Sequence, residues 1–155
     1  FKGINHISLI VFIFLFLGMG IYYTQFSTSE IVKNISLKPN DAPTVNLGGS
    51  VYAKNCASCH GANLEGQINW RQRDSNGYLP APPHDESGHT WHHSDQYLFL
   101  MTKYGIEEMI GKRYPNNMPA YKDVLTDDEI IAVLSYIKST WPEQIKQQHN
   151  TLNSR

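Results

Sequence analysis

The stretch Cys56-Ala57-Ser58-Cys59-His60 holds the residues whose types and spacing could do chemistry together. Two thiols separated by two residues can add to the two vinyl groups of one haem, and the histidine that follows at once can bind its iron. The chain has 2 cysteines, and this C-x-x-C-H motif uses both. We therefore predict that Cys56 and Cys59 attach a haem covalently and that His60 is an axial ligand.

Three other uses of the cysteine pair fit the sequence less well. A disulfide between Cys56 and Cys59 would close a very short loop, which is geometrically poor. A thioredoxin-like pair would follow a strand, but no alternating strand pattern precedes the motif in Val51–Asn55. A zinc site would need two more ligands, and no second cysteine pair supplies them.

A second iron ligand is expected from the loop around Met118. This residue lies in the stretch Pro115-Asn116-Asn117-Met118-Pro119, so turn-forming residues flank it on both sides. A loop can place a thioether over the iron without strain from a helix. Met118 is also well separated from His60 along the chain, so the chain can wrap from one haem face to the other. Met109 is the alternative ligand, whereas Met101 is expected in the core, on the apolar face of a helix.

Residues 61–93 are rich in Gly and Pro and lack apolar periodicity, so we expect a long ordered loop that wraps the haem edge. Its candidates for donating N–H groups to the haem propionates are Trp70, Arg71, Arg73 and Trp91. The two arginines could equally be solvated. The carbonyl of Pro82 or of a neighbour could accept the second ring N–H of His60 and so fix the orientation of that ring.

The same loop carries a cluster of ionisable residues: His84, His89, His92 and His93. These histidines could bind copper or zinc, or supply a second axial histidine. No carboxylate or thiol completes a recognisable metal spacing, so the cluster is more typical of titrating surface histidines beside a haem.

A short helix is expected to lead into the motif. Gly48-Gly49 should break any earlier helix, and Ser50 is a good N-cap for a helix over Val51–Ala57. Residues 25–46 are mixed and polar, contain prolines and show no sustained period, which predicts a linker.

Two further helices are expected after the loop. Ser94 is a good N-cap for a helix to about Tyr104, where a glycine follows. Thr126-Asp127-Asp128-Glu129 is a capping box for the other helix, whose apolar stripe reaches Trp141 and should pack on the helix before the motif. Residues 143–155 are polar and are expected to fray.

The N-terminal segment Ile7–Tyr23 is uncharged and apolar, so residues 1–24 are predicted to be a membrane anchor. A cleaved signal peptide is the alternative, but Thr24–Ser29 is a poor cleavage site and the run exceeds the usual apolar region of such peptides. Lys2 precedes the run and no basic residue soon follows it, which predicts an N-terminus kept inside and a domain outside.

The length of 155 residues allows one domain with appendages. The net charge is −1 and the basic residues are scattered, so the chain shows no nucleic-acid footprint.

Over residues 47–142, the order of helix, C-x-x-C-H, long loop, helix, Met-Pro loop and C-terminal helix resembles a class I, monohaem bacterial cytochrome c. Within that class it is similar to the small cytochrome c domains associated with respiratory oxidases. The resemblance implies an all-α fold of three to five helices around one covalently attached haem. It carries over Cys56 and Cys59 as thioether sites, His60 as proximal ligand and Met118 as distal ligand. The stretch GHTWHHSDQYLFLMTKYG and Met118-Pro119-Ala120 are similar to those of membrane-tethered members.

The resemblance implies a one-electron carrier and not an enzyme, because an iron bound by both His60 and Met118 has no open position. The haem domain would lie in the periplasm, anchored to the bacterial inner membrane. Its partners would be redox proteins such as a terminal oxidase or a quinol-oxidising complex, with no nucleic acid and no small-molecule substrate. Two alternatives remain open: a haem enzyme or sensor with an open or His-switched distal site, and a copper-binding accessory protein that uses the His84–His93 loop.

Overall fold

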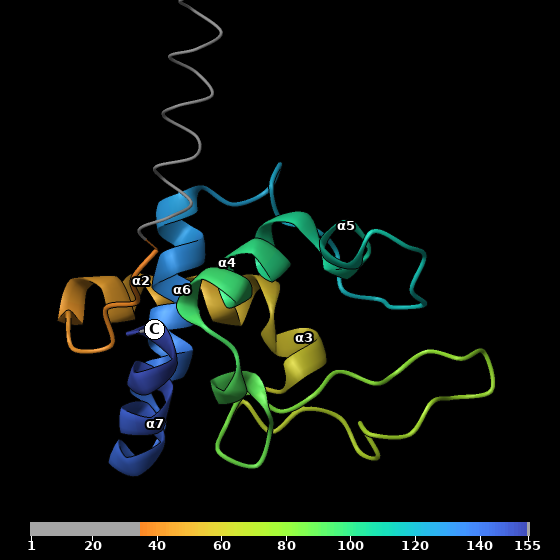
Figure 1. Cartoon of the computed structure of the whole chain (residues 1–155), viewed down its shortest axis with the longest axis horizontal. Coiled ribbons are helices and arrows are strands. Elements are labelled where there is room, and N and C mark those ends of the chain that lie inside the picture. The colour runs from red at the N-terminus through yellow and green to blue at the C-terminus, as the bar shows by residue number, and fades with distance from the viewer. Residues whose placement is uncertain (1–34, 155) are drawn as a thin grey trace, which may run out of the picture. The chain divides into compact units, whose positions relative to one another are not determined.

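The computed structural model describes residues 35–154, which form one folded unit of helices joined by loops (Figure 1). The helices are α2 (Ala42–Asn55), α3 (Ala57–His60), α4 (Asp95–Tyr104), α5 (Ile106–Ile110), α6 (Asp127–Ser139) and α7 (Glu143–Asn153), with one 3₁₀ turn, η1 (Thr90–His92). No strand occurs among these 120 residues, so the described part has the predicted all-α class.

The predicted membrane segment Ile7–Tyr23 lies outside the described residues, as does the first part of the predicted linker, residues 25–34. Within residues 35–154, no helix has the length and apolar character that crossing a bilayer requires. The predicted anchor therefore stays a prediction.

The second part of the expected linker instead contributes to the fold. Helix α2 begins at Ala42, where the carboxylate of Asp41 accepts a hydrogen bond from the backbone N–H of Thr44 at 3.0 Å. The helix then continues through Gly48-Gly49, so the prediction of a helix start at Ser50 is wrong.

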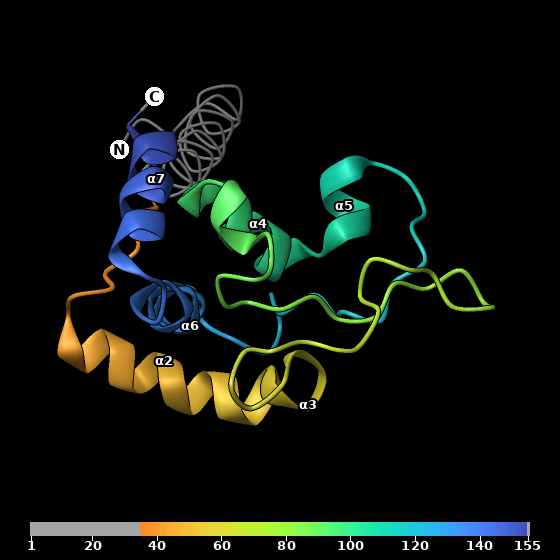
Figure 2. The same cartoon turned by 90° about the horizontal axis from the view of Figure 1, so that it is seen from below.

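Helix α2 continues through the two glycines because it packs closely against α6, and the two helices lie side by side (Figure 2). A Cβ atom added to Gly48 would collide with the carbonyl oxygen of Ala132 on α6. Glycine lets the two helix backbones approach this closely, and the packing that results outweighs the poor helix propensity of two glycines.

Helix α6 begins with the capping box that the sequence predicts. The N–H of Thr126 donates to a Glu129 carboxylate oxygen at 2.8 Å, and the N–H of Glu129 donates to the Thr126 hydroxyl at 3.3 Å. The helix packs on α2, as expected, and its apolar stripe forms the centre of the core. The buried apolar residues are Leu37, Val51, Tyr52, Leu64, Leu98, Phe99, Tyr121, Leu125, Ile130, Val133, Leu134, Ile137 and Trp141.

Helix α4 also begins and ends where the sequence predicts. The Ser94 hydroxyl accepts from the N–H of Tyr97 at 3.2 Å, and Gly105 follows the helix with a φ of 81°. Its last turn is tied to the start of α6 by an ion pair of 2.6 Å between Lys103 and Asp127.

At the C-terminus the structure differs from the expected frayed tail. Residues 143–153 form helix α7, and the side chain of His149 on it is fully buried, at 0% exposure. Its Nε2 donates to the carbonyl of His93 at 2.8 Å. Polar contacts of His149 and Asn153, with one partly buried apolar residue, Ile145, hold this helix in place of an apolar stripe, which explains why hydrophobic periodicity does not reveal it.

A buried carboxylate, Asp95 at the start of α4, joins α7 to the rest of the fold. Its Oδ2 accepts from the N–H of Leu37 at 2.9 Å, and its own N–H donates to the Asn153 side chain at 2.7 Å. The Lys138 ammonium lies 3.7 Å and the His149 ring nitrogen 3.6 Å from its other oxygen. Buried charges of this kind are stable only when they are paired and hydrogen-bonded, as they are here.

Candidate haem-binding site

The two cysteines lie where α2 passes into α3. Cys56 separates the two helices and Cys59 is on α3, so a spacing of three residues places them on one side of a helical turn. Neither thiol is in a disulfide; Cys56 is half-buried and Cys59 is exposed. Burial, and then the neighbouring Cys59, raise the pKa of Cys56 to about 11, so its thiol is neutral near pH 7.

His60 ends α3 and is buried, with 8% of its surface exposed. Its Nδ1 lies 2.8 Å from the carbonyl oxygen of Pro82, as the sequence analysis expected. A carbonyl only accepts, so Nδ1 must carry the proton, and Nε2 keeps the lone pair that a metal needs. Burial also lowers the pKa of His60, which favours the neutral form that binds metals.

Two tyrosines hold the motif from either side, and the sequence analysis did not identify this role. The Tyr52 hydroxyl donates to the carbonyl of Gly61 at 2.8 Å, and the Tyr121 hydroxyl donates to the carbonyl of Asn55 at 2.8 Å. Tyr52 precedes Cys56 by one helical turn, which is a signal that could have been used. Nothing in the local sequence indicates the contact made by Tyr121.

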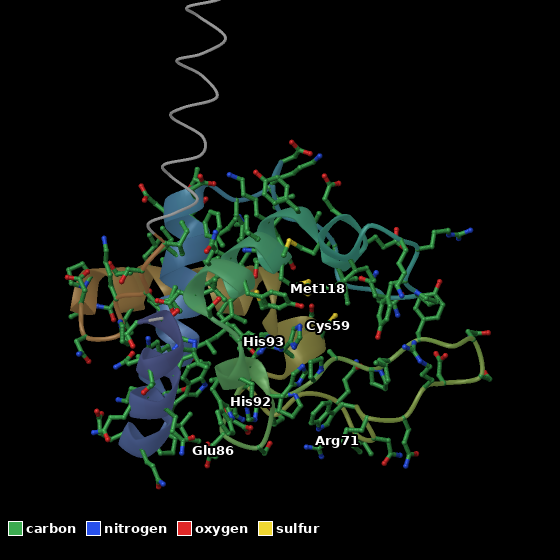
Figure 3. The ribbon with its side chains drawn as sticks, viewed as in Figure 1. Cys59, Arg71, Glu86, His92, His93 and Met118 are labelled. Carbon is green, nitrogen blue, oxygen red and sulfur yellow. The ribbon has the colours of Figure 1, made fainter. Side chains whose placement is uncertain are left out.

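Met118 lies in the loop that follows α5, and 38% of its surface is exposed. Its N–H donates to the Asn116 side chain at 3.1 Å, and the Asn116 amide donates to the carbonyl of Tyr114 at 2.9 Å. Figure 3 shows Met118 and Cys59 in the same part of the view. The thioether is therefore exposed on an ordered turn, whereas Met109 belongs to α5.

The predicted loop, residues 61–93, contains no strand and no helix except the 3₁₀ turn η1 near its end, and its own hydrogen bonds order it. The N–H of Gly66 donates to the carbonyl of His60 at 2.8 Å, and the N–H of Gln67 donates to the carbonyl of Ala81 at 2.9 Å. The loop thus folds back on the end of α3.

Arg73 connects this loop to the loop that carries Met118. Its guanidinium donates to the carbonyl of Gly77 at 2.6 Å and to the hydroxyl of Tyr114 at 2.9 Å. Arg73 thus has protein partners, and its predicted role at a propionate stays a prediction.

The other propionate candidates also contact protein groups. The Arg71 guanidinium lies over the Trp70 ring, 4.0 Å from its centroid. The Trp91 indole N–H lies 3.4 Å from the carbonyl of Glu86. Any propionate contact by Trp91 would compete with this long hydrogen bond.

Of the four loop histidines, His89 and His93 lie edge to face with ring centroids 5.5 Å apart, but each of the four also stacks on a separate ring. The stacked pairs are His84 on His60, His89 on Trp70, His92 on Trp91 and His93 on Tyr97. In the part of the chain that the structure describes, no group of three His, Cys, Asp or Glu side chains could hold a metal ion. The predicted alternative of a copper or zinc site in this loop therefore gains no support.

The donor set at the motif fits a covalently bound haem. It consists of two thiols free of a disulfide on one side of a helical turn, and a buried neutral imidazole whose Nε2 is left for the iron. An exposed thioether lies on a separate loop.

Comparison with known proteins agrees with this donor set. The sequence model described as cytochrome c matches residues 45–141. The chain therefore belongs to the cytochrome c family, as its sequence predicts, and this family implies covalently bound haem c.

Among individual proteins, the chain is similar to the Cbb3-type cytochrome c oxidase subunit FixP of Sinorhizobium medicae (strain WSM419). The two are 25% identical over 114 residues, which cover 73% of this chain and 35% of that relative. The match thus spans about a third of the length of the relative. No solved structure shows a significant match.

Proposed function

We propose that this protein is a one-electron carrier that uses a single covalently attached haem c. The observation that carries the proposal is the buried imidazole of His60, which is oriented by the Pro82 carbonyl beside the free thiols of Cys56 and Cys59. When bound, the haem would supply an iron that takes up and releases one electron.

Each residue of the site has a distinct part in this proposal. The sulfur atoms of Cys56 and Cys59 would hold the haem through thioethers. Nε2 of His60 would bind the iron on one face, and the thioether of Met118 would bind it on the other. With both axial positions filled by side chains, no substrate could reach the metal, which favours electron transfer over catalysis.

Fixed ligands suit this function. The hydroxyls of Tyr52 and Tyr121 hold the backbone on both sides of α3. The carbonyl of Pro82 holds the ring of His60. Such hydrogen bonds to the ligand and to its helix keep the ligand in one orientation in both redox states.

We further propose that residues 1–24 anchor the carrier in the bacterial inner membrane, with its haem domain in the periplasm. The partners would be a respiratory oxidase and a donor such as a quinol-oxidising complex. The similarity to a protein named as an oxidase subunit supports the first partner. An anchor would raise the effective concentration of the carrier near membrane partners.

Three measurements test the proposal. A haem stain after denaturing electrophoresis should show haem on the polypeptide, and a potentiometric titration should show one reversible one-electron transition. Loss of haem on denaturation would contradict covalent attachment. Co-purification with an oxidase after mild detergent extraction would indicate a subunit, and its absence would indicate a free carrier.

A further inference from the structure

We propose that His84 is a positioning residue for His60, whose ring lies against the His60 ring and fixes the plane of that imidazole. This inference rests on the proposed function, because the orientation of the ring matters once His60 binds an iron. Nothing in the family match or in the haem motif assigns a role to His84.

The first observation is the contact between the two rings. Their centroids are 4.0 Å apart and their planes differ by 23°, so the rings are stacked. The hydrogen bond from Nδ1 of His60 to the Pro82 carbonyl holds the ring at one edge. A single bond at an edge leaves the ring able to rock about it, and a flat group against the face restricts that motion.

The second observation is that His84 is itself held at three points. Its N–H donates to the carbonyl of Leu64 at 2.8 Å, and its carbonyl accepts from the Trp141 indole N–H at 2.8 Å. Its ring Nδ1 lies 2.8 Å from the hydroxyl of Thr90, a buried residue. Backbone and ring are thus fixed to three separate parts of the fold, so the ring offers a rigid surface to His60.

The third observation is the backbone of Leu64, which accepts the N–H of His84. Leu64 is buried and has a φ of 70°, in the left-handed region that residues other than glycine rarely adopt. Such a conformation costs energy and persists only where its surroundings impose it, often at functional sites. Here it directs a carbonyl to the residue that stacks on the proposed ligand.

The same loop supplies a control, because His92 stacks on Trp91 with ring centroids 3.7 Å apart. Stacking is common to the four loop histidines, but among them His84 is the one that stacks on His60. Changing His92 alters the loop without altering the ring that lies on His60.

The test uses the full-length, haem-loaded protein and the NMR spectrum of its oxidised form. The order and spread of the haem methyl resonances report the orientation of an axial imidazole plane. The variant His84→Leu keeps an apolar side chain of similar size but lacks a flat ring, and His84→Phe restores a flat ring without the bond to Thr90. His92→Leu is the matched control.

We expect His84→Leu to change the order or spread of the haem methyl resonances, while His84→Phe and His92→Leu keep the wild-type pattern. A wild-type pattern in His84→Leu would overturn the proposal, as would an equal change in His84→Phe. If His84→Leu fails to incorporate haem, His84→Gln decides, because it keeps a polar side chain but has no flat ring: we expect a changed pattern, and a wild-type pattern would overturn the proposal. The wild-type protein alone tests the proposed function, so its failure is distinguishable from a failure of the inference.

Discussion

At the scale of single residues, the two cysteines of the motif differ in their surroundings. Cys56 is half-buried between two helices, and Cys59 is exposed on α3. His60 is buried, and its ring is hydrogen-bonded to the carbonyl of Pro82 in the following loop. Each thioether should therefore contribute separately to haem retention, whereas the orientation of the imidazole should not depend on either.

Cys59→Ala should leave one thioether, at Cys56, and weaken haem retention without removing the ligand His60. Staining for haem after denaturing electrophoresis should show a clearly reduced signal per polypeptide. Ser58→Ala, a change next to the same cysteine, is the control and should stain like the wild type. An undiminished stain in Cys59→Ala would contradict the role of its thiol.

Met118→Ala should remove the distal ligand. The long-wavelength absorbance band of sulfur-ligated ferric haem should disappear, and the midpoint potential should fall because the axial thioether raises it. Met109→Ala on the neighbouring helix α5 is the control and should keep both properties. If Met109→Ala loses the band and Met118→Ala retains it, the ligand role belongs to Met109.

At the scale of elements, the position of the motif depends on the crossing of α2 and α6. Helix α2 leads directly into Cys56, and at Gly48 it passes too close to the Ala132 carbonyl of α6 to leave room for a Cβ atom. A change in this crossing would move the end of α2 and with it the thiols.

Gly48→Ala should destabilise the protein by roughly 1–3 kcal/mol, because the new methyl group would collide with the Ala132 carbonyl in a packed interface. Urea unfolding of the haem-loaded protein would measure this.

Gly49→Ala is a matched control: its methyl group would meet only the Tyr136 ring, at 3.4 Å. It should be neutral or stabilise the helix by up to about 1 kcal/mol. Equal destabilisation by both changes would rule out the crossing as the cause.

At the scale of the whole molecule, a buried polar network closes the fold far along the chain from the motif. It contains Asp95, Lys138 and His149 and joins α4, α6 and α7 to the segment before α2. Burial, and then the nearby Lys138, lower the pKa of His149. The pKa of Lys138 is lowered by burial and raised in part by Asp95.

The free energy of unfolding should fall as the pH drops below about 6.5, the usual pKa of histidine. Because the pKa of His149 is lowered in the folded protein, the unfolded chain takes up the proton first as the pH falls. The stabilisation that comes from keeping His149 neutral is therefore complete above about pH 6.5 and is lost between that pH and the lower pKa of the folded state. The loss amounts to about 1.4 kcal/mol per unit of depression.

Urea unfolding at pH 8 and pH 5 would measure this dependence. The loop histidines His84, His89 and His93, whose pKa values are also lowered, add to the pH dependence with the same sign. The contribution of His149 is therefore the difference between the wild type and His149→Gln. The glutamine can still donate to the His93 carbonyl but does not titrate. A pH dependence that is equal in both proteins would contradict the assignment.

The features that the sequence predicts correctly are those set by local signals. The N-cap of Ser94 and the capping box at Thr126 depend on neighbours within one turn, and both are confirmed. One contact beyond a single turn was also anticipated: the chemistry of a metal-binding histidine calls for a carbonyl partner of His60, Pro82 or a neighbour was the candidate, and the structure places Pro82 there.

The features that the sequence analysis missed depend on contacts between distant segments. The course of α2 through Gly48 is explained only by its contact with Ala132, and the docking of α7 depends on polar contacts of His149 and Asn153 with distant residues. The hydroxyl of Tyr121 reaches the carbonyl of Asn55, 66 residues away in the chain. No local pattern specifies such pairs. The axial role of Met118 stays a prediction.

The most direct test of the central claim is the optical spectrum of the oxidised and reduced protein, with and without carbon monoxide. If the iron is closed by His60 and Met118, the oxidised protein should show the long-wavelength band of sulfur ligation. The spectrum of the reduced protein should then be unchanged by carbon monoxide. Absence of that band together with ready binding of carbon monoxide would contradict the electron carrier and favour a haem enzyme or sensor with an open site.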